Sequence, residues 1–126
     1  MFRIYISDIN NWPLSRAEDI SLADFTHKVE QSMLDTNRHF TWIHFEGRNI
    51  DNAVQQINWL HSKATQEHWR DQLTISVELE KPDRENIDSL LDKGDMVFFS
   101  KLFAKTRGFE NASDFLKEYS KRCRPR

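Results

Sequence analysis

Charged and hydroxyl-bearing side chains gather just after three short apolar runs in the middle of the sequence. Guanidinium and ammonium groups at such positions can hold phosphate oxygens. Carboxylates there can bind sugar hydroxyls, or a metal ion through water. Because strands without any site also end in polar turns, the spacing alone leaves a purely structural role open. The candidate site residues from this pattern are Glu46, Arg48, Glu80, Lys81, Ser100 and Lys101.

The three apolar runs have the length and residue types of β-strands. They span residues 41–46, 73–80 and 96–100 and are rich in β-branched and aromatic side chains. The run at 96–100 is apolar almost throughout, which predicts a strand buried on both faces. The run at 73–80 alternates apolar and polar residues, which predicts a strand with one face less covered.

Helical patterns separate the strands. Apolar residues recur with a period of 3.6 over 49–65. A second helix is predicted from Pro82 to Gly94, and two more over 101–107, closed by Gly108, and over 111–122. Ser21 is a candidate N-cap of an earlier helix. Residues 3–7 suit a further strand, and a turn follows at 10–13.

The alternation of strands and helices predicts an α/β fold with a parallel sheet built from β-α-β-α-β units. Ligands of parallel sheets sit beyond the carboxyl ends of the strands. The three polar exits are therefore expected at one edge of the sheet, close to one another.

The composition restricts the class of protein. The 126 residues carry 18 basic and 20 acidic side chains and a net charge of −2, which favours neither a nucleic-acid partner nor a membrane partner. The single cysteine, Cys123, excludes an internal disulfide and predicts a reducing, cytoplasmic location. The sequence has 3 glycines. It contains neither Gly-x-Gly-x-x-Gly nor Gly-x-x-x-x-Gly-Lys, the two glycine-rich motifs that form phosphate-binding loops.

Three segments resemble motifs of the ketohexokinases, the animal fructokinases among the ribokinase-like, PfkB-type sugar kinases. W-I-H-F-E-G-R-N at 42–49 is similar to their W-[IV]-H-[IF]-E-G-R-N, and S-V-E-L-E-K-P at 76–82 to their S-V-E-[VLI]-E-K-P. D-M-V-F-F-S-K at 95–101 resembles D-V-V-F-[VIF]-S-K and is followed by the expected A-K and G-F pairs at 104–105 and 108–109. A weaker similarity joins R-I-Y-I at 3–6 and N-W-P at 11–13 to the family's R-T-I-V strand and N-L-P.

The resemblance implies a three-layer ribokinase-like α/β fold, of which the chain resembles a middle fragment. Residues 1–126 would form part of a carbohydrate kinase domain: 1–14 a remnant of the β lid, 15–40 a helix with a surface insertion, and 41–126 the α/β core. The implied activity is the ATP-dependent phosphorylation of fructose to fructose 1-phosphate. Family members use Mg2+ and often K+, and they are homodimers.

The resemblance also assigns roles to individual residues. It implies that Arg3 approaches the nucleotide phosphates and that the strand exits line the cleft near nucleotide and metal. The nucleotide- and phosphate-binding residues would then be Arg3, Arg48, Lys81, Ser100 and Lys101, and the metal-side or cleft carboxylates Glu46 and Glu80.

The family's catalytic aspartate lies in a D-T-x-G-A-G-D motif that this sequence does not contain. The motif supplies both the base and the anion hole for phosphoryl transfer. We therefore assign no catalytic residue and expect the chain alone to be inactive. The alternative is a non-catalytic α/β chain that associates with a full-length kinase subunit. An unrelated nucleotide-binding domain is disfavoured because no glycine-rich loop is present.

Overall fold

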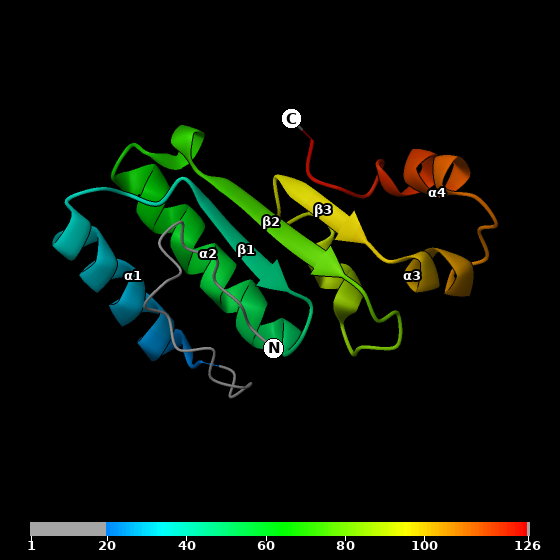
Figure 1. Ribbon diagram of the computed structural model, residues 1–126, viewed down its shortest axis with the longest axis horizontal. Helices are drawn as coiled ribbons and strands as arrows, with labels where there is room; N and C mark the ends of the chain where they lie inside the picture. The colour runs from blue at the N-terminus through cyan, green and yellow to red at the C-terminus, as the bar shows by residue number, and fades with distance from the viewer. Residues whose placement is uncertain (1–19, 126) are drawn as a thin grey trace.

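The computed structural model describes residues 20–125, which form a three-stranded parallel sheet flanked by helices (Figure 1). This confirms the predicted fold class and is consistent with a piece of a ribokinase-like fold. The strand order is β1-β2-β3. The elements are α1 (Leu22–Thr36), β1 (Trp42–Glu46), α2 (Ile50–Gln66), the 3-10 turn η2 (Arg70–Gln72), β2 (Thr74–Leu79), the 3-10 turn η3 (Ile87–Leu90), β3 (Met96–Phe99), α3 (Lys101–Thr106) and α4 (Ala112–Tyr119).

The register brings the carboxyl ends of all three strands to one edge of the sheet. His44 lies opposite Ser76, and Ser76 in turn lies opposite Met96. The three arrowheads in Figure 1 accordingly point the same way. The predicted parallel arrangement of the strands is confirmed.

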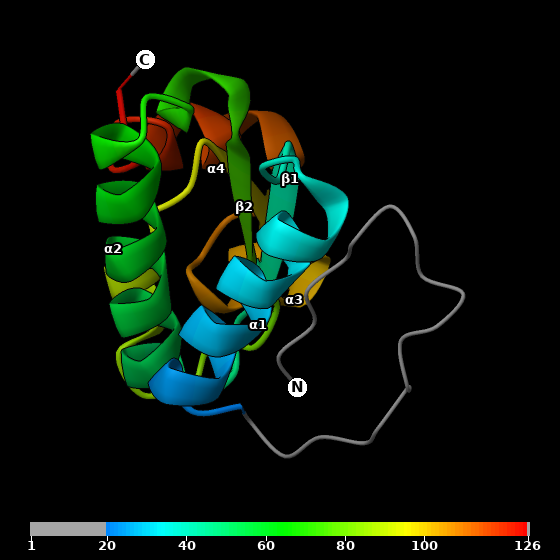
Figure 2. The same ribbon diagram turned by 90° about the vertical axis from the view of Figure 1, so that its left-hand side faces the viewer.

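Helix α2 runs along one face of the sheet (Figure 2), and the β1 and β2 side chains on this face are fully buried. Helix α2 buries a stripe with helical periodicity, as the sequence predicted. The side chains that meet between sheet and helix are Ile43, Phe45, Ile75, Val77 and Leu79 from the strands and Ile50, Ala53, Ile57, Leu60 and Ala64 from α2. Every second residue of β1 and β2 belongs to this core, because side chains alternate across a strand.

Helix α1 extends this core beyond β1. Its N-cap is Ser21, whose hydroxyl accepts the Asp24 amide at 3.1 Å, as predicted. Phe25 packs against Phe45 and edge-on against Trp59. The helix continues to Thr36, so most of the stretch 26–40 is helical. That this part of the chain contains a surface insertion, relative to the kinases it resembles, stays a prediction.

The other face of the sheet is only partly covered by the described residues. Trp42 is 47% exposed and Phe98 is 45% exposed. The prediction that β3 is buried on both faces is therefore wrong, because β3 is an edge strand and none of its four residues is fully buried. The prediction for β2 is confirmed in part: Thr74 and Glu78 on this face are half-buried, but Ser76 between them is fully buried, and the other face of β2 is buried throughout.

The helix predicted from Pro82 to Gly94 is also wrong. This segment contains only turns and η3. Asn86 adopts a left-handed conformation with φ of 60°, which an α-helix cannot contain. Ile87 and Leu90 are buried and anchor the turn against the core. Gly94 does not end a helix; it lies where the backbone of β3 approaches that of β2.

The two C-terminal helices form around an aromatic cluster beyond β3. Phe99 contacts Phe103, Phe115 and Tyr119 at centroid distances of 4.8–5.8 Å. Helix α3 ends before Gly108, whose φ of 90° suits glycine, as predicted. Helix α4 buries Phe115 and Tyr119, but Ala112 and Leu116, predicted on the same apolar face, are exposed.

Among residues 20–125, no helix is long and apolar enough to cross a bilayer.

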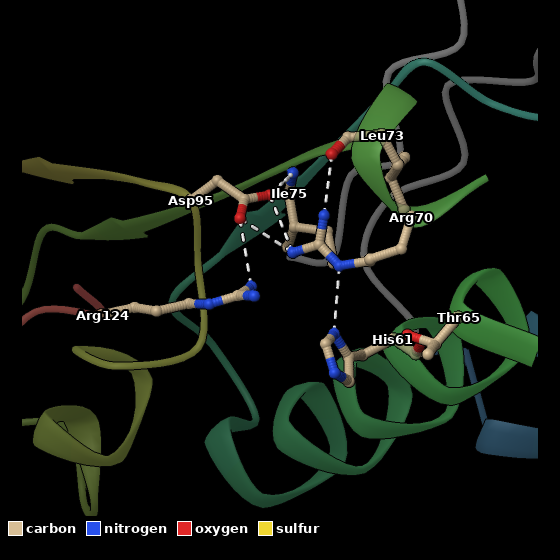
Figure 3. A network of polar contacts seen from close by, with 7 residues as sticks. All are labelled: His61, Thr65, Arg70, Leu73, Ile75, Asp95 and Arg124. Atoms are coloured by element: carbon tan, nitrogen blue, oxygen red, sulfur yellow. Dashed lines mark hydrogen bonds and ion pairs between the residues drawn. The ribbon is translucent and has the colours of Figure 1, made fainter. Parts of the chain in front are cut away.

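A network of charged groups ties the amino edge of the sheet together (Figure 3). The Asp95 carboxylate accepts hydrogen bonds from Arg70 at 2.8 and 2.9 Å, from the Ile75 amide at 2.8 Å and from Arg124 at 3.1 Å. Burial acts to raise the pKa of Asp95, but these hydrogen bonds and the two guanidinium charges outweigh it and hold the pKa below its usual value. Arg70 also donates to His61 Nδ1 at 3.0 Å. Burial and the charges of Arg70 and Arg124 lower the pKa of His61.

We expect Asp95→Asn to lower the free energy of unfolding at pH 7 by about 1–3 kcal/mol, because Arg70 loses a charged partner in a half-buried place. A carboxylate whose pKa is depressed on folding stabilises the protein above its unfolded pKa, and that contribution is lost as the pH falls through the folded pKa. The difference between variant and wild type should therefore shrink below about pH 4. Urea unfolding across a pH series measures it. Asp92→Asn, at an exposed aspartate, is the matched control; equal destabilisation by both variants would contradict the assignment.

Candidate functional site

The carboxyl ends of β1 and β2 enclose a cavity of about 330 Å³, which we call the carboxyl-edge hollow. Its size is at the lower end of the range for small-molecule sites. Four of the predicted site residues line it: Glu46, Arg48, Glu80 and Lys81. The complete lining is Glu46, Gly47, Arg48, Glu78, Glu80, Lys81 and Arg84. The sheet thus brings together residues that are more than 30 positions apart in the sequence.

A glycine allows the β1 exit to lie against β2. Directly after the strand, the Arg48 amide donates to the Glu46 carbonyl at 2.8 Å and so forms a tight turn. A Cβ at Gly47, between them, would collide with the carbonyl oxygen of Glu78 and lie 3.0 Å from Ile87 Cδ1. The absence of a side chain at Gly47 therefore keeps Arg48 close to the exit of β2.

The turn after β2 brings a further cation to the hollow. The Arg84 amide donates to the Lys81 carbonyl at 3.3 Å, and the Ile87 amide donates to the Arg84 carbonyl at 3.2 Å. Asn86 Nδ2 donates to Asp51 Oδ1 at 3.2 Å, which joins this turn to the first turn of α2. The segment that does not become a helix instead folds Arg84 back over the strand ends.

The hollow combines three cations with three carboxylates. Among residues 20–125, the side chains of Arg48, Lys81 and Arg84 form neither an ion pair nor a hydrogen bond with a protein group. Helix α2 begins at Ile50, two residues after Arg48, and its amino end carries partial positive charge. These features favour an anionic group in the hollow.

The remaining predicted residues lie elsewhere. Ser100 accepts the Phe103 amide at 2.9 Å as the N-cap of α3, and its hydroxyl donates to the Glu80 carbonyl. Lys101 begins α3 and is exposed, and neither residue lines the hollow. Arg3 lies outside the described residues. Ligand-binding roles for these residues stay predictions.

Three lining residues, Gly47, Glu78 and Arg84, are not among the site residues predicted from the sequence. The predicted strand over 73–80 contains Glu78 two positions before Glu80, and therefore on the same face. That period of two is the signal that could have identified it. No sequence pattern indicates Arg84 as a site residue, because the sequence predicts a helix that begins at Pro82.

Among residues 20–125, no cluster of three or more His, Cys, Asp or Glu side chains is arranged to hold a metal ion.

Part of the sequence is similar to a known sugar kinase. It is 35% identical over 99 residues to ketohexokinase from Mus musculus, a match that covers 79% of this chain and 30% of the mouse protein. The chain thus spans less than a third of the length of this relative. No protein-family model matches the sequence. The comparison agrees with the resemblance found in the motifs.

We expect Gly47→Ala to destabilise the protein by about 1–3 kcal/mol, because the new Cβ would meet the backbone of β2 and force the strand exits apart. The same displacement should move Arg48 away from the hollow. Urea unfolding and the amide chemical shifts of residues 46–48 and 78–81 measure the two effects. Glu85→Ala is the control, because Glu85 is exposed in the turn after β2 and does not line the hollow. Unchanged stability in Gly47→Ala would contradict this account.

Proposed function

We propose that this chain is part of a ketohexokinase-like sugar kinase, a domain that as a whole transfers a phosphoryl group from ATP to fructose and forms fructose 1-phosphate. The observation that carries the proposal is the group of three cations, Arg48, Lys81 and Arg84, which have no protein partner among residues 20–125 and line one hollow at the carboxyl edge of a parallel sheet. The similarity to mouse ketohexokinase supports the choice of a kinase over other phosphate-binding proteins.

The three cations suit the phosphates of a nucleotide. Arg48 and Arg84 carry planar guanidinium groups that bind phosphate oxygens in pairs, and Lys81 adds a compact charge. The amino end of α2 adds its partial charge to theirs. When bound, ATP supplies the phosphoryl group that is transferred. The residues of this chain hold and orient its phosphates.

The carboxylates of the hollow fit Mg2+ that is held in part by other ligands. Mg2+ takes one or two carboxylates and completes its shell with water and substrate phosphates. Glu46 and Glu80 offer such carboxylates beside the phosphate-binding cations. Carboxylates also accept hydrogen bonds from sugar hydroxyls, which is the role proposed for fructose. Dependence on K+ and dimerisation stay predictions from the resemblance.

The chain by itself is proposed to bind its ligands without turning them over. Phosphoryl transfer needs a base at the acceptor hydroxyl and donors that stabilise the moving group. Loss of a single such donor costs a factor of about 10²–10³ in rate. The family motif that combines both functions, D-T-x-G-A-G-D, does not occur in the 126 residues.

One observation favours the alternative, a non-catalytic chain that associates with a full-length kinase subunit. Parallel sheets are almost always covered on both faces. Here the described residues leave Trp42 and Phe98 about half exposed on one face. A kinase subunit that covers this face would bury both rings.

We expect the 126-residue chain to bind ATP, and expect Arg48→Gln and Lys81→Gln each to weaken that binding about tenfold, the effect of losing one charge-assisted hydrogen bond. Isothermal titration at low ionic strength measures the affinity. Arg38→Gln is the matched control, because Arg38 precedes β1 and lies outside the hollow. Equal weakening by the control, or no binding by the wild type, would overturn the phosphate-binding role.

We expect no fructose 1-phosphate from the chain incubated with fructose, ATP and Mg2+, because the base and the anion hole are absent from its sequence. A phosphate-transfer assay followed by mass spectrometry measures the product. Product at a rate proportional to the concentration of the chain would contradict this.

Co-elution of the chain with mouse ketohexokinase on size exclusion would support the alternative, a non-catalytic chain that associates with a full-length kinase subunit.

A further inference from the structure

A row of polar side chains in contact with one another crosses the partly exposed face of the sheet and ends at the carboxyl-edge hollow. Trp42 Nε1 donates to Ser76 Oγ at 2.8 Å, and Ser76 Oγ lies 2.7 Å from His44 Nδ1. On the far side of the imidazole ring, His44 Nε2 lies 3.6 Å from Glu78 Oε2. Glu78 lines the hollow, so the row connects the middle of the sheet to the candidate site.

The chemistry of these groups fixes the direction of the hydrogen bonds. An indole N–H can only donate, so Ser76 Oγ accepts from Trp42. Ser76 is 0% exposed, and its hydroxyl proton therefore needs a protein acceptor. His44 Nδ1 is the acceptor that the described residues provide. With Nδ1 as an acceptor, the neutral ring carries its hydrogen on Nε2, which faces Glu78. The opposite tautomer would leave the buried Ser76 hydroxyl without an acceptor.

Packing holds the imidazole ring of His44 in this orientation. The His44 side chain is 17% exposed, and the Phe98 ring meets it nearly edge-on, with centroids 5.9 Å apart. The Glu78 side chain is 37% exposed and is the more accessible member of the pair. A ring fixed on one side by Ser76 and on another by Phe98 directs its Nε2–H dipole toward that carboxylate.

Serine, histidine and glutamate in this order also form catalytic triads in hydrolases. A nucleophilic role does not fit here, because the Ser76 hydroxyl is fully buried and cannot reach a substrate. The row is therefore a means of positioning its exposed end. That end is the Glu78 carboxylate in a hollow that also contains Arg48, Lys81 and Arg84.

From this geometry we propose that His44, locked as the Nε2–H tautomer by Ser76 and Trp42, is a positioning residue that holds Glu78 at the hollow, and that Glu78 selects phosphate ligands that carry a hydroxyl group. The proposal rests on the proposed function for the binding of phosphate by the cations. The carboxylate accepts a hydrogen bond from a ligand hydroxyl, whether of a ribose or of a sugar phosphate. Toward a ligand made of phosphate alone, the same negative charge is repulsive.

The ligand half of the proposal is tested with ATP, fructose 1-phosphate and inorganic tripolyphosphate as probes on the full chain. Glu78→Gln should weaken ATP or fructose 1-phosphate binding about tenfold while tripolyphosphate binds equally or more tightly. His44→Phe should shift the ratio of affinities in the same direction, and Arg38→Gln should leave it unchanged. Weakening of only one of the two hydroxyl ligands would identify the ribose or the sugar as the source of the hydroxyl. An unchanged ratio in Glu78→Gln would overturn the role of Glu78.

The positioning half is tested without any ligand. Long-range ¹⁵N–¹H spectra of the histidine rings should report the Nε2–H tautomer for His44 in the wild type. Ser76→Ala and Trp42→Phe, which keep the packing, should give a mixture of tautomers. A mixture in the wild type, or an unchanged tautomer in Ser76→Ala, would overturn the lock. If no probe binds the wild type while the tautomer is as expected, the proposed function and the ligand half fail, and the lock stands.

Discussion

The parallel pairing of β1 with β2 and of β2 with β3 is the constraint on which the rest of the structure depends. A parallel connection must cross over and return the chain to the starting edge, so every strand ends at the same edge. At Gly47, after β1, and Gly94, before β3, the neighbouring backbone lies so close that a Cβ would have no room. The hollow therefore follows from the sheet: it is the space that two neighbouring strand exits and the turn after β2 enclose.

The two edges of the sheet differ in whether their charged side chains have partners within the protein. At the amino edge, Asp95 is paired with Arg70 and Arg124 and bonded to a backbone amide (Figure 3), so the charges are satisfied within the protein. At the carboxyl edge, Arg48 and Lys81 have no such partner among residues 20–125. A satisfied network stabilises a fold, whereas cations that lack protein partners keep their capacity to bind an external anion. This contrast separates the structural edge from the candidate binding edge.

The partly exposed face of the sheet combines exposed aromatic rings with a buried hydrogen-bonded serine. Its aromatic side chains are about half exposed, yet Trp42 and His44 cover and satisfy the fully buried Ser76. Such an arrangement costs little only when every polar member has a partner. The hydrogen bonds among Trp42, Ser76 and His44 hold these side chains in place, although this face is partly exposed. The row of side chains also relates residues of the sheet interior to Glu78 at the hollow.

The sequence by itself determined the three strands, α2, the cap at Ser21 and four residues of the hollow, because periodicity and capping are local properties of the chain. Only the tertiary structure decided that β3 is an edge strand and that Asn86 interrupts the expected helix, because burial and turn geometry depend on neighbours distant in sequence. The same holds for Arg84 and His44. Their roles arise from a turn folded against α2 and from the pairing of His44 with Ser76, which no local pattern encodes.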